Sequence, residues 1–128
     1  MSSESTTVRQ VRLDGTGGDP FFVEPPTAFD EVQEVLGRKW HLRIVYQLLE
    51  RGPMGFNALK EQVVGISSKM LSESLTRLED DGLVDRELVS DQPLRVEYSL
   101  TECGAALEPV VWGVLRWSSE YGPTVEEA

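Results

Sequence analysis

The sequence predicts a mainly α-helical domain that contains one small β-hairpin. Apolar residues recur at helical spacing between Ala28 and Asp80, the period changes to two after Gly82, and helical spacing returns after Thr101. The length of 128 residues suits one domain, and a hydrophobic content of 40% is enough for a single modest core.

Three helices are expected in the first half of this domain. Their apolar positions fall at 29, 32, 35 and 36, at 40, 44, 45, 48 and 49, and at 56, 59 and 63. Glycines are expected to end them, at Gly37, at Gly52 (followed by a proline) and near Gly65.

A fourth helix is predicted within the stretch GISSKMLSESLTRLEDDGLV, residues 65–84. Leu71, Leu75 and Leu78 are spaced so that one face is buried. Ser67 or Ser68 can cap the amino terminus, and Gly82 supplies a left-handed residue that ends the helix. The face expected to be exposed carries small hydroxyls and a few charges: Ser67, Ser68, Lys69, Ser72, Glu73, Thr76 and Arg77.

A β-hairpin and a final helix follow. Residues 84–89 and 95–100 alternate with a period of two on either side of the loop SDQPL. Thr101 is expected to cap a last helix that Pro109 should kink. The helices on either side of Gly65 then form a helix-turn-helix, with the hairpin as a wing. The predicted fold is therefore a winged helix-turn-helix with an extra C-terminal helix.

The ends of the chain differ from this domain. Residues 1–27 are polar and rich in glycine and proline, so we expect a flexible arm, whose apolar FFV segment can dock on the body or on a partner. The folded domain should span 28–122, with an acidic tail at 123–128. The start lacks a secretory pattern, no run approaches the ~20 apolar residues of a membrane span, and there is one cysteine. We expect a cytoplasmic protein.

The charge balance is strongly acidic. The net charge is −10, with 22 acidic residues against 12 basic ones, of which only Lys39, Lys60 and Lys69 are lysines. Such a chain should repel nucleic acid at ordinary salt. Either it does not bind nucleic acid, or it works where salt screens the repulsion, since the Debye length falls to ~3 Å at 1 M. Acid-rich, lysine-poor chains resemble proteins of salt-loving archaea; the alternative is an ordinary acidic bacterial protein.

No catalytic or metal-binding set is evident. His41 and Cys103 are the only residues of their types, and a metal site needs about three or four ligands. We find no phosphate loop, no nucleophile triad and no carboxylate pair with a clear role, so neither an enzyme nor a cofactor is expected. His41 is expected at the surface or its boundary. Cys103 falls in the first turn of the last helix, where a thiol can be redox-active, but a small buried hydrophobe is favoured.

Five phrases in register carry a family resemblance. They are G-x-K-W at 37–40, F-N-x-L at 56–59, G-I-S-x-x-x-L-S-x-x-L at 65–75, L-E-x-D-G-L-V at 78–84 and R-V-E-Y-x-L-T-x-x-G at 95–104. Together they resemble the HxlR-type winged helix-turn-helix transcription regulators over roughly three quarters of the chain, from Phe29 to Tyr121.

The resemblance implies a homodimer that binds operator DNA and is held by its first and last helices. The helix at 67–80 would lie in the major groove, and the wing at 84–100 would touch the backbone or the minor groove. Two positions depart from the family pattern. Thr27 stands where members usually carry a cysteine used to sense oxidants or electrophiles, and Glu73 occupies a position that is often basic.

The expected DNA contacts combine the exposed face of the fourth helix with the wing. Hydroxyls can donate to phosphates or reach base edges; the alternative is an ordinary solvated helix face. Glu73 can accept from a cytosine amino group, although repulsion that lowers affinity, or simple surface acidity, is favoured. The candidate residues are Ser67, Ser68, Lys69, Ser72, Glu73, Thr76, Arg77 and Arg95.

Other cations are open to two interpretations. On the hairpin, a DNA role is favoured for Arg95, and only weakly for Arg86; the alternative is pairing with neighbouring carboxylates such as Glu97. Arg38, Lys39 and Arg43, which open the second helix, can touch the flanking DNA backbone or pair with Glu34 or Asp30.

The last helix carries an apolar band that is wide for one small core. Leu107, Val111 and Val114 can face inward, and aromatic anchors suit an interface between two copies; the alternative is packing within one chain. The candidate interface residues are Phe29, Val32, Leu36, Val110, Val114, Trp117 and Tyr121.

Two other functions remain open: a winged-helix module that binds protein, and a regulator that responds to a small-molecule effector held near the dimer helices.

Overall fold

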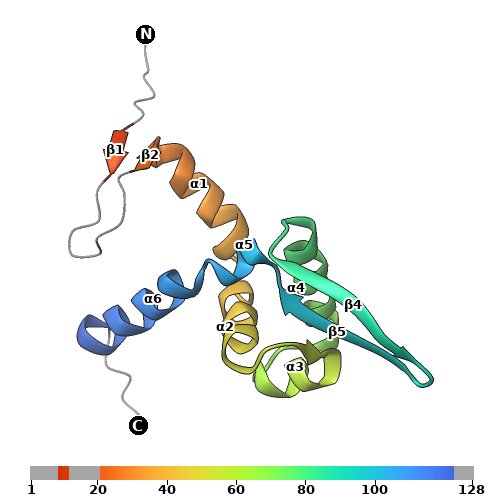
Figure 1. Cartoon of the computed structure of the whole chain (residues 1–128). Coiled ribbons are helices and arrows are strands. Elements are labelled where there is room, and N and C mark those ends of the chain that lie inside the picture. Colours follow the sequence, from red (N-terminus) through yellow and green to blue (C-terminus); the bar gives the residue numbers. More distant parts are fainter. Residues whose placement is uncertain (1–8, 12–20, 123–128) are drawn as a thin grey trace. The chain divides into compact units, whose positions relative to one another are not determined.

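A computed structural model of the chain describes residues 9–11 and 21–122 (Figure 1). The expected acidic tail and most of the expected N-terminal arm lie outside the described residues. The chain divides into two units, one up to Arg38 and one from Lys39 onward. Within the described part, no helix is both long and apolar enough to cross a membrane.

The first unit contains more regular structure than the sequence predicts. Strand β1 (Arg9–Val11) pairs antiparallel with β2 (Phe21–Val23), so that the FFV segment forms a strand. Helix α1 (Pro25–Leu36) begins three residues earlier than Ala28. Two prolines open it, which is favourable because an amide at the first helical positions has no partner inside the helix.

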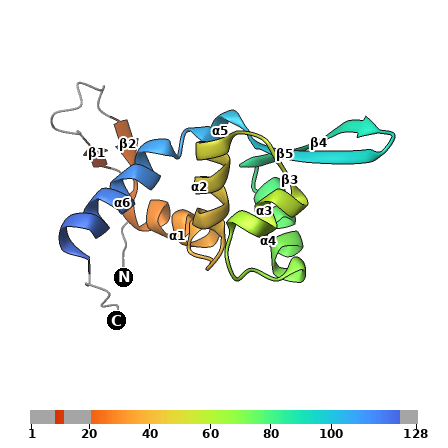
Figure 2. The ribbon, with the colours of Figure 1, turned by 90° about the horizontal axis from the view of Figure 1, so that it is seen from below.

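The second unit is the winged helix-turn-helix. Helices α2 (His41–Arg51), α3 (Phe56–Gln62) and α4 (Ser68–Asp80) precede the hairpin, as predicted (Figure 2). Their apolar faces meet in one core. Its most completely buried apolar side chains are Ile44, Val45, Leu59, Leu71, Leu75 and Leu78. The helical periodicity of the sequence therefore locates the core correctly.

Both ends of α4 are fixed by local hydrogen bonds. At the start, the Ser67 hydroxyl accepts the Met70 backbone N–H at 3.0 Å. At the end, Gly82 has φ +82°, and the N–H groups of Gly82 and Leu83 each donate over 2.9 Å, to the carbonyls of Glu79 and Leu78. This pair of bonds is a Schellman cap, so the predicted start and stop of the helix are confirmed.

The hairpin belongs to a three-stranded antiparallel sheet in the order β3-β5-β4. Strands β4 (Val84–Asp91) and β5 (Leu94–Leu100) run further than predicted, which reduces the expected loop to Gln92 and Pro93. The unpredicted β3 (Met54–Gly55) pairs with the base of β5. Beyond Val84 the residues of β4 are mostly exposed, because the hairpin extends away from the helices as a wing (Figure 1).

The single kinked C-terminal helix was a wrong prediction. Two helices stand in its place, α5 (Glu102–Ala105) and α6 (Glu108–Tyr121). Pro109 lies in the first turn of α6, where a proline begins a helix without removing a hydrogen bond. The Thr101 hydroxyl accepts the Gly104 N–H at 3.0 Å, as expected for a cap, and donates to the Gly82 carbonyl at 2.7 Å. Thr101 therefore joins the end of α4 to the start of α5.

Candidate nucleic-acid interface

The outer face of α4 is exposed along its whole length. All seven residues predicted to be exposed are so: Ser67, Ser68, Lys69, Ser72, Glu73, Thr76 and Arg77. Although the Ser67 oxygen already accepts the capping bond, a hydroxyl has one donor and two acceptor lone pairs. Its O–H can therefore still donate to an external acceptor.

The spacing of these side chains divides the face into two parallel stripes. Ser68, Ser72 and Thr76 lie four residues apart, so their hydroxyls line up along the helix axis. Lys69, Glu73 and Arg77 form a second stripe of alternating charge; none of the three makes an ion pair within the described part of the chain. The face therefore presents hydroxyl donors and two unpaired cations beside one carboxylate.

The opposite side of α4 holds this face in place. Leu71, Leu75 and Leu78 are at most 1% exposed, and Ser74 is buried beside them. Because α4 is fixed through its core face and both caps, its outer side chains project from a rigid support.

The wing is less basic than its arginines suggest. Arg95 is 66% exposed, and its guanidinium lies 3.8 Å from the Glu97 carboxylate, which is the pairing that competes with a DNA role. Glu87 lies directly opposite Glu97 across the hairpin, so the carboxylate that pairs with Arg95 faces a second carboxylate. An exposed ion pair contributes only ~0–1 kcal/mol, and a phosphate could replace Glu97 as the partner. Arg86, opposite Tyr98, makes no ion pair among the residues described.

A further group of cations surrounds Trp40, at the start of α2. Lys39 Nζ lies 4.8 Å from the centre of the Trp40 ring, and the Arg43 guanidinium carbon lies 5.3 Å from it. Their neighbour Arg38 pairs with Glu34 at 3.7 Å. Of the two interpretations left open by the sequence, ion pairing therefore applies to Arg38. It does not apply to Lys39 or Arg43 within the described residues.

Helix α6 presents a largely apolar surface. Only Val111 is buried on it, and the exposed apolar side chains are Val110, Trp112, Val114, Leu115, Trp117 and Tyr121. Val114, which was expected to face inward, lies on the side of α6 toward α2 but is only partly covered, with 48% of its surface exposed. Trp112 and Leu115 were missed, although their spacing of three residues could have indicated a shared face.

The interface candidates on α1 differ in their exposure to solvent. Phe29 and Val32 are 68% and 51% exposed, as an intermolecular contact requires. Leu36, the last residue of the helix, is only 8% exposed, which removes it from the candidate surface.

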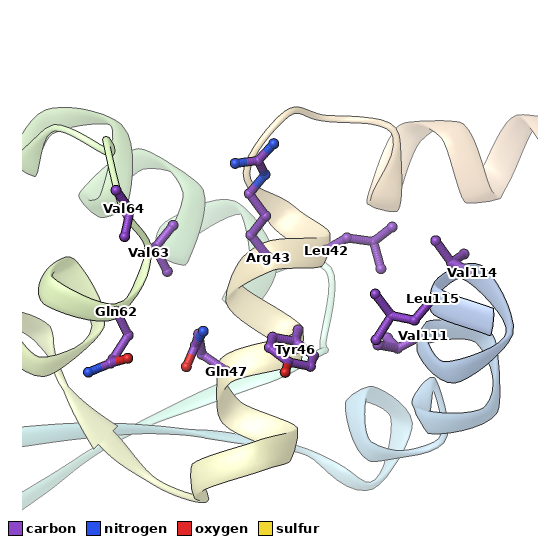
Figure 3. A pocket seen from close by; sticks show the side chains of 10 residues that line it. All are labelled: Leu42, Arg43, Tyr46, Gln47, Gln62, Val63, Val64, Val111, Val114 and Leu115. Atoms are coloured by element: carbon purple, nitrogen blue, oxygen red, sulfur yellow. The ribbon is translucent and has the colours of Figure 1, made fainter. Parts of the chain in front are cut away.

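A cavity of about 370 Å³ lies between α2, the end of α3 and α6 (Figure 3). Figure 3 shows Val111, Val114 and Leu115 on one side and Gln62, Val63 and Val64 on the other, with α2 between them. From α2 come Leu42, Arg43, Tyr46 and Gln47. The lining is mostly apolar with a few hydrogen-bonding groups, a composition typical of small-molecule sites.

Two single residues differ from expectation. His41 is buried, 2% exposed, because it lies on the inner side of the first turn of α2. Cys103 is exposed, because the short α5 turns Gly104 and not Cys103 toward the body; a Cβ on Gly104 would lie 2.2 Å from the Leu83 carbonyl oxygen. The described residues contain no cluster of histidine, cysteine and carboxylates that could hold a metal ion.

Comparison with known proteins decides the family. Residues 35–126 match the HxlR-like helix-turn-helix family. The chain belongs to this family. YvaP, an uncharacterised HTH-type transcriptional regulator of Bacillus subtilis (strain 168), is 36% identical over 93 residues, covering 73% of this chain and 85% of that protein. An archaeal HTH-type regulator from Methanothermobacter thermautotrophicus is 31% identical over 115 residues, covering 90% of this chain and 84% of that protein.

Solved structures of the HxlR family share the fold. The redox regulator HypR in its oxidised form matches with a TM-score of 0.68 and 35% identity, covering 77% of this chain and 99% of that one. The quinone-bound YodB of B. subtilis matches with a TM-score of 0.64 and 32% identity, over 74% and 99% of the two chains. The chain is thus an HTH-type transcription regulator and not an enzyme. Its relatives come from bacteria and an archaeon, which does not support the expected salt-loving archaeal source.

Proposed function

We propose that this HxlR-family regulator binds a specific operator as a homodimer, with α4 in the major groove and the wing on the backbone or in the minor groove. The observation that carries the proposal is the outer face of α4, where hydroxyls and unpaired cations are exposed on a helix fixed at both ends. Hydroxyl and cationic groups hydrogen-bond to phosphates and to base edges.

Individual residues have distinct roles in this proposal. Ser68, Ser72 and Thr76 contact base edges or phosphates, whereas Ser67, Lys69 and Arg77 act mainly as donors to phosphates. Arg95 exchanges Glu97 for a phosphate when DNA is bound. Glu73 opposes the DNA charge and reduces affinity.

The dimer places one recognition helix in each of two successive major grooves, about one helical turn apart. Its contacts come from the exposed apolar residues of α1 and α6: Phe29, Val32, Val110, Val114, Trp117 and Tyr121. Because hydroxyls and only a few cations make the DNA contacts, few net counterions are released, and affinity falls with salt less steeply than for a basic repressor.

The test uses operator DNA selected by the protein from a random-sequence pool. A variant carrying Lys69→Gln, Ser72→Ala and Arg95→Gln should lose operator affinity and remain a dimer, since these positions are exposed. The control is Arg51→Gln at the far end of α2, which should bind as the wild type does. An intact dimer that selects no sequence at any KCl concentration would contradict the proposal and favour a winged-helix module that binds protein.

The cavity supports an additional property, control by a small-molecule effector. Its volume of about 370 Å³ lies within the ~300–1,000 Å³ of ligand sites, and the related YodB has been crystallised with a quinone. The cavity borders Val63 and Val64, which lie five and four residues before α4 starts at Ser68, so a ligand there can change the position of the recognition helix.

A melting-temperature screen with small aromatic compounds, quinones included, tests this second property. A ligand that binds the native state raises the melting temperature, and Leu115→Trp, which fills the cavity, should abolish that rise. A rise that persists in the variant would place the ligand elsewhere.

A further inference from the structure

Lys39 and Arg43 are both held against the ring of Trp40, at 4.8 Å and 5.3 Å from its centre. Both side chains are exposed, and neither makes an ion pair within the described part of the chain. This arrangement occurs in a protein with 22 acidic residues, where carboxylate partners are abundant. Two cations kept together without a carboxylate therefore need an explanation.

The position of Lys39 and Arg43 at the amino terminus of α2 is electrostatically unfavourable when no anion is bound. The amino terminus of a helix carries partial positive charge, so acidic residues stabilise it and cations do not. The first turn of α2 contains no acidic residue, and no side chain caps it. The cations repel each other as well as the helix terminus. Local conflicts of this kind are expected at functional sites, where binding of an anion relieves them.

The pair also lies beside the start of the recognition helix. The Trp40 ring comes within 3.8 Å of the point where a Cβ on Gly65 would stand. Gly65 lies two residues before Ser67, which caps the amino terminus of α4. In helix-turn-helix proteins the amino-terminal part of the recognition helix enters the groove, so the phosphates bordering that groove pass close to this point.

We propose that Lys39 and Arg43, supported by Trp40, form a phosphate-binding site for the DNA backbone next to α4. The inference rests on the proposed DNA binding and adds a contact outside the recognition helix and the wing. A duplex backbone suits this site because both cations are exposed on an open surface. The contact fixes the position of the protein on the duplex and carries no sequence information.

The experiment measures the affinity of full-length variants for the selected operator and for an unrelated duplex of equal length, over a series of KCl concentrations. Lys39→Gln and Arg43→Gln are compared singly and together. Lys39→Arg preserves the charge. Arg51→Gln removes a cation from the opposite end of the same helix. Molar mass and circular dichroism confirm that each variant is folded and assembled as the wild type is.

In the proposed homodimer each substitution is present in both subunits, so each neutralising substitution should lower the slope of log affinity against log salt by about 2, and the double variant by about 4. Both duplexes should be weakened by the same factor, so operator selectivity stays constant. Lys39→Arg and Arg51→Gln should keep the wild-type slope. Because Arg43 also lines the cavity and Lys39 does not, an effect of Lys39→Gln cannot arise from a cavity ligand.

Unchanged slopes in Lys39→Gln and Arg43→Gln, with operator selectivity retained, would overturn this inference and leave the proposed function standing. A fall in selectivity without a change in slope would also overturn it, since that result indicates base contacts. Failure of the wild-type protein to bind either duplex would overturn both proposals together.

Discussion

Helices α4 and α6 are nearly equal in length, with 13 and 14 residues, yet they distribute their side chains in opposite ways. Helix α4 buries three leucines and one serine and turns hydroxyls and charges outward. Helix α6 buries Val111 alone and turns two tryptophans, a tyrosine and three aliphatic side chains outward. The leucines of α4 are thus buried within the chain, whereas most apolar side chains of α6 remain exposed.

The contrast indicates two different partners. A polar outer face on a rigid helix suits a hydrated, charged surface such as DNA. A contiguous exposed apolar face marks an interaction site, and aromatic residues are enriched in protein interfaces. One chain can therefore contact its operator through α4 and a second copy through α6, and substitutions can separate these two surfaces.

The largest expected effect comes from placing the same substitution on both helices. Leu71→Ala removes a fully buried side chain of α4, and should reduce the free energy of unfolding by ~2–5 kcal/mol at every protein concentration. Leu115→Ala removes a side chain of α6 that is 46% exposed. Its cost should be smaller, because this side chain lines the open cavity and already keeps nearly half of its surface in solvent. Urea unfolding at two concentrations measures both.

A charge on the apolar face of α6 should dissociate the dimer. Trp117 is 59% exposed, and Trp117→Glu should weaken dimerisation by at least ~2 kcal/mol, about 30-fold in Kd, with helix content unchanged. Light scattering across a dilution series gives the molar mass. Ser119→Glu adds the same charge two residues along the helix and should leave the dimer intact. Equal dissociation by both variants would mean that the effect is electrostatic and not confined to the apolar face.

Alanine substitutions of two glycines extend the comparison of α4 with α6. Gly82 ends α4 with φ +82°, so Gly82→Ala should destabilise the protein by ~1–2 kcal/mol. Gly113 lies within α6, and a Cβ there would meet no atom within 4 Å. Gly113→Ala should stabilise the helix by ~0.5–1 kcal/mol. Thermal unfolding measures both, and effects of the same sign would contradict the assignment of the two conformations.

The smallest effect concerns the carboxylate on α4. Glu73→Gln should strengthen operator binding by ~0.5 kcal/mol per subunit, about twofold, because it removes a repulsion from the phosphates. The gain should disappear near 1 M salt, where the Debye length is ~3 Å. Glu120→Gln makes the same change on α6 and should have no effect. Weaker binding by Glu73→Gln would indicate that Glu73 accepts a hydrogen bond from a base.

The elements that the sequence predicted correctly are those with local signals. The cap at Ser67, the left-handed Gly82 and the leucine spacing of α4 all act within a few residues of one another. Strand β3 was missed because it is two residues long and exists through pairing with Tyr98 and Glu97, more than forty positions away. The β1–β2 pair was missed for the same reason, since neither three-residue strand has a pattern of its own.

The same distinction between local and long-range signals applies to the surface residues. The exposed face of α4 followed from periodicity, because the buried leucines define the opposite side. For Lys39 and Arg43 the sequence left DNA contact and ion pairing both open, because their positions relative to Trp40 and the start of α4 depend on tertiary packing. The break between α5 and α6 was missed because a proline inside an apolar band can either kink a helix or begin one.

Footprinting of the wild-type protein on its selected operator tests most directly that α4 contacts DNA while α6 pairs two copies. The expected result is two protected stretches on one face of the duplex, about 10 base pairs apart, for one bound dimer, with Trp117→Glu protecting each half-site only weakly. A single protected stretch at saturation, or protection without sequence preference, would contradict the account.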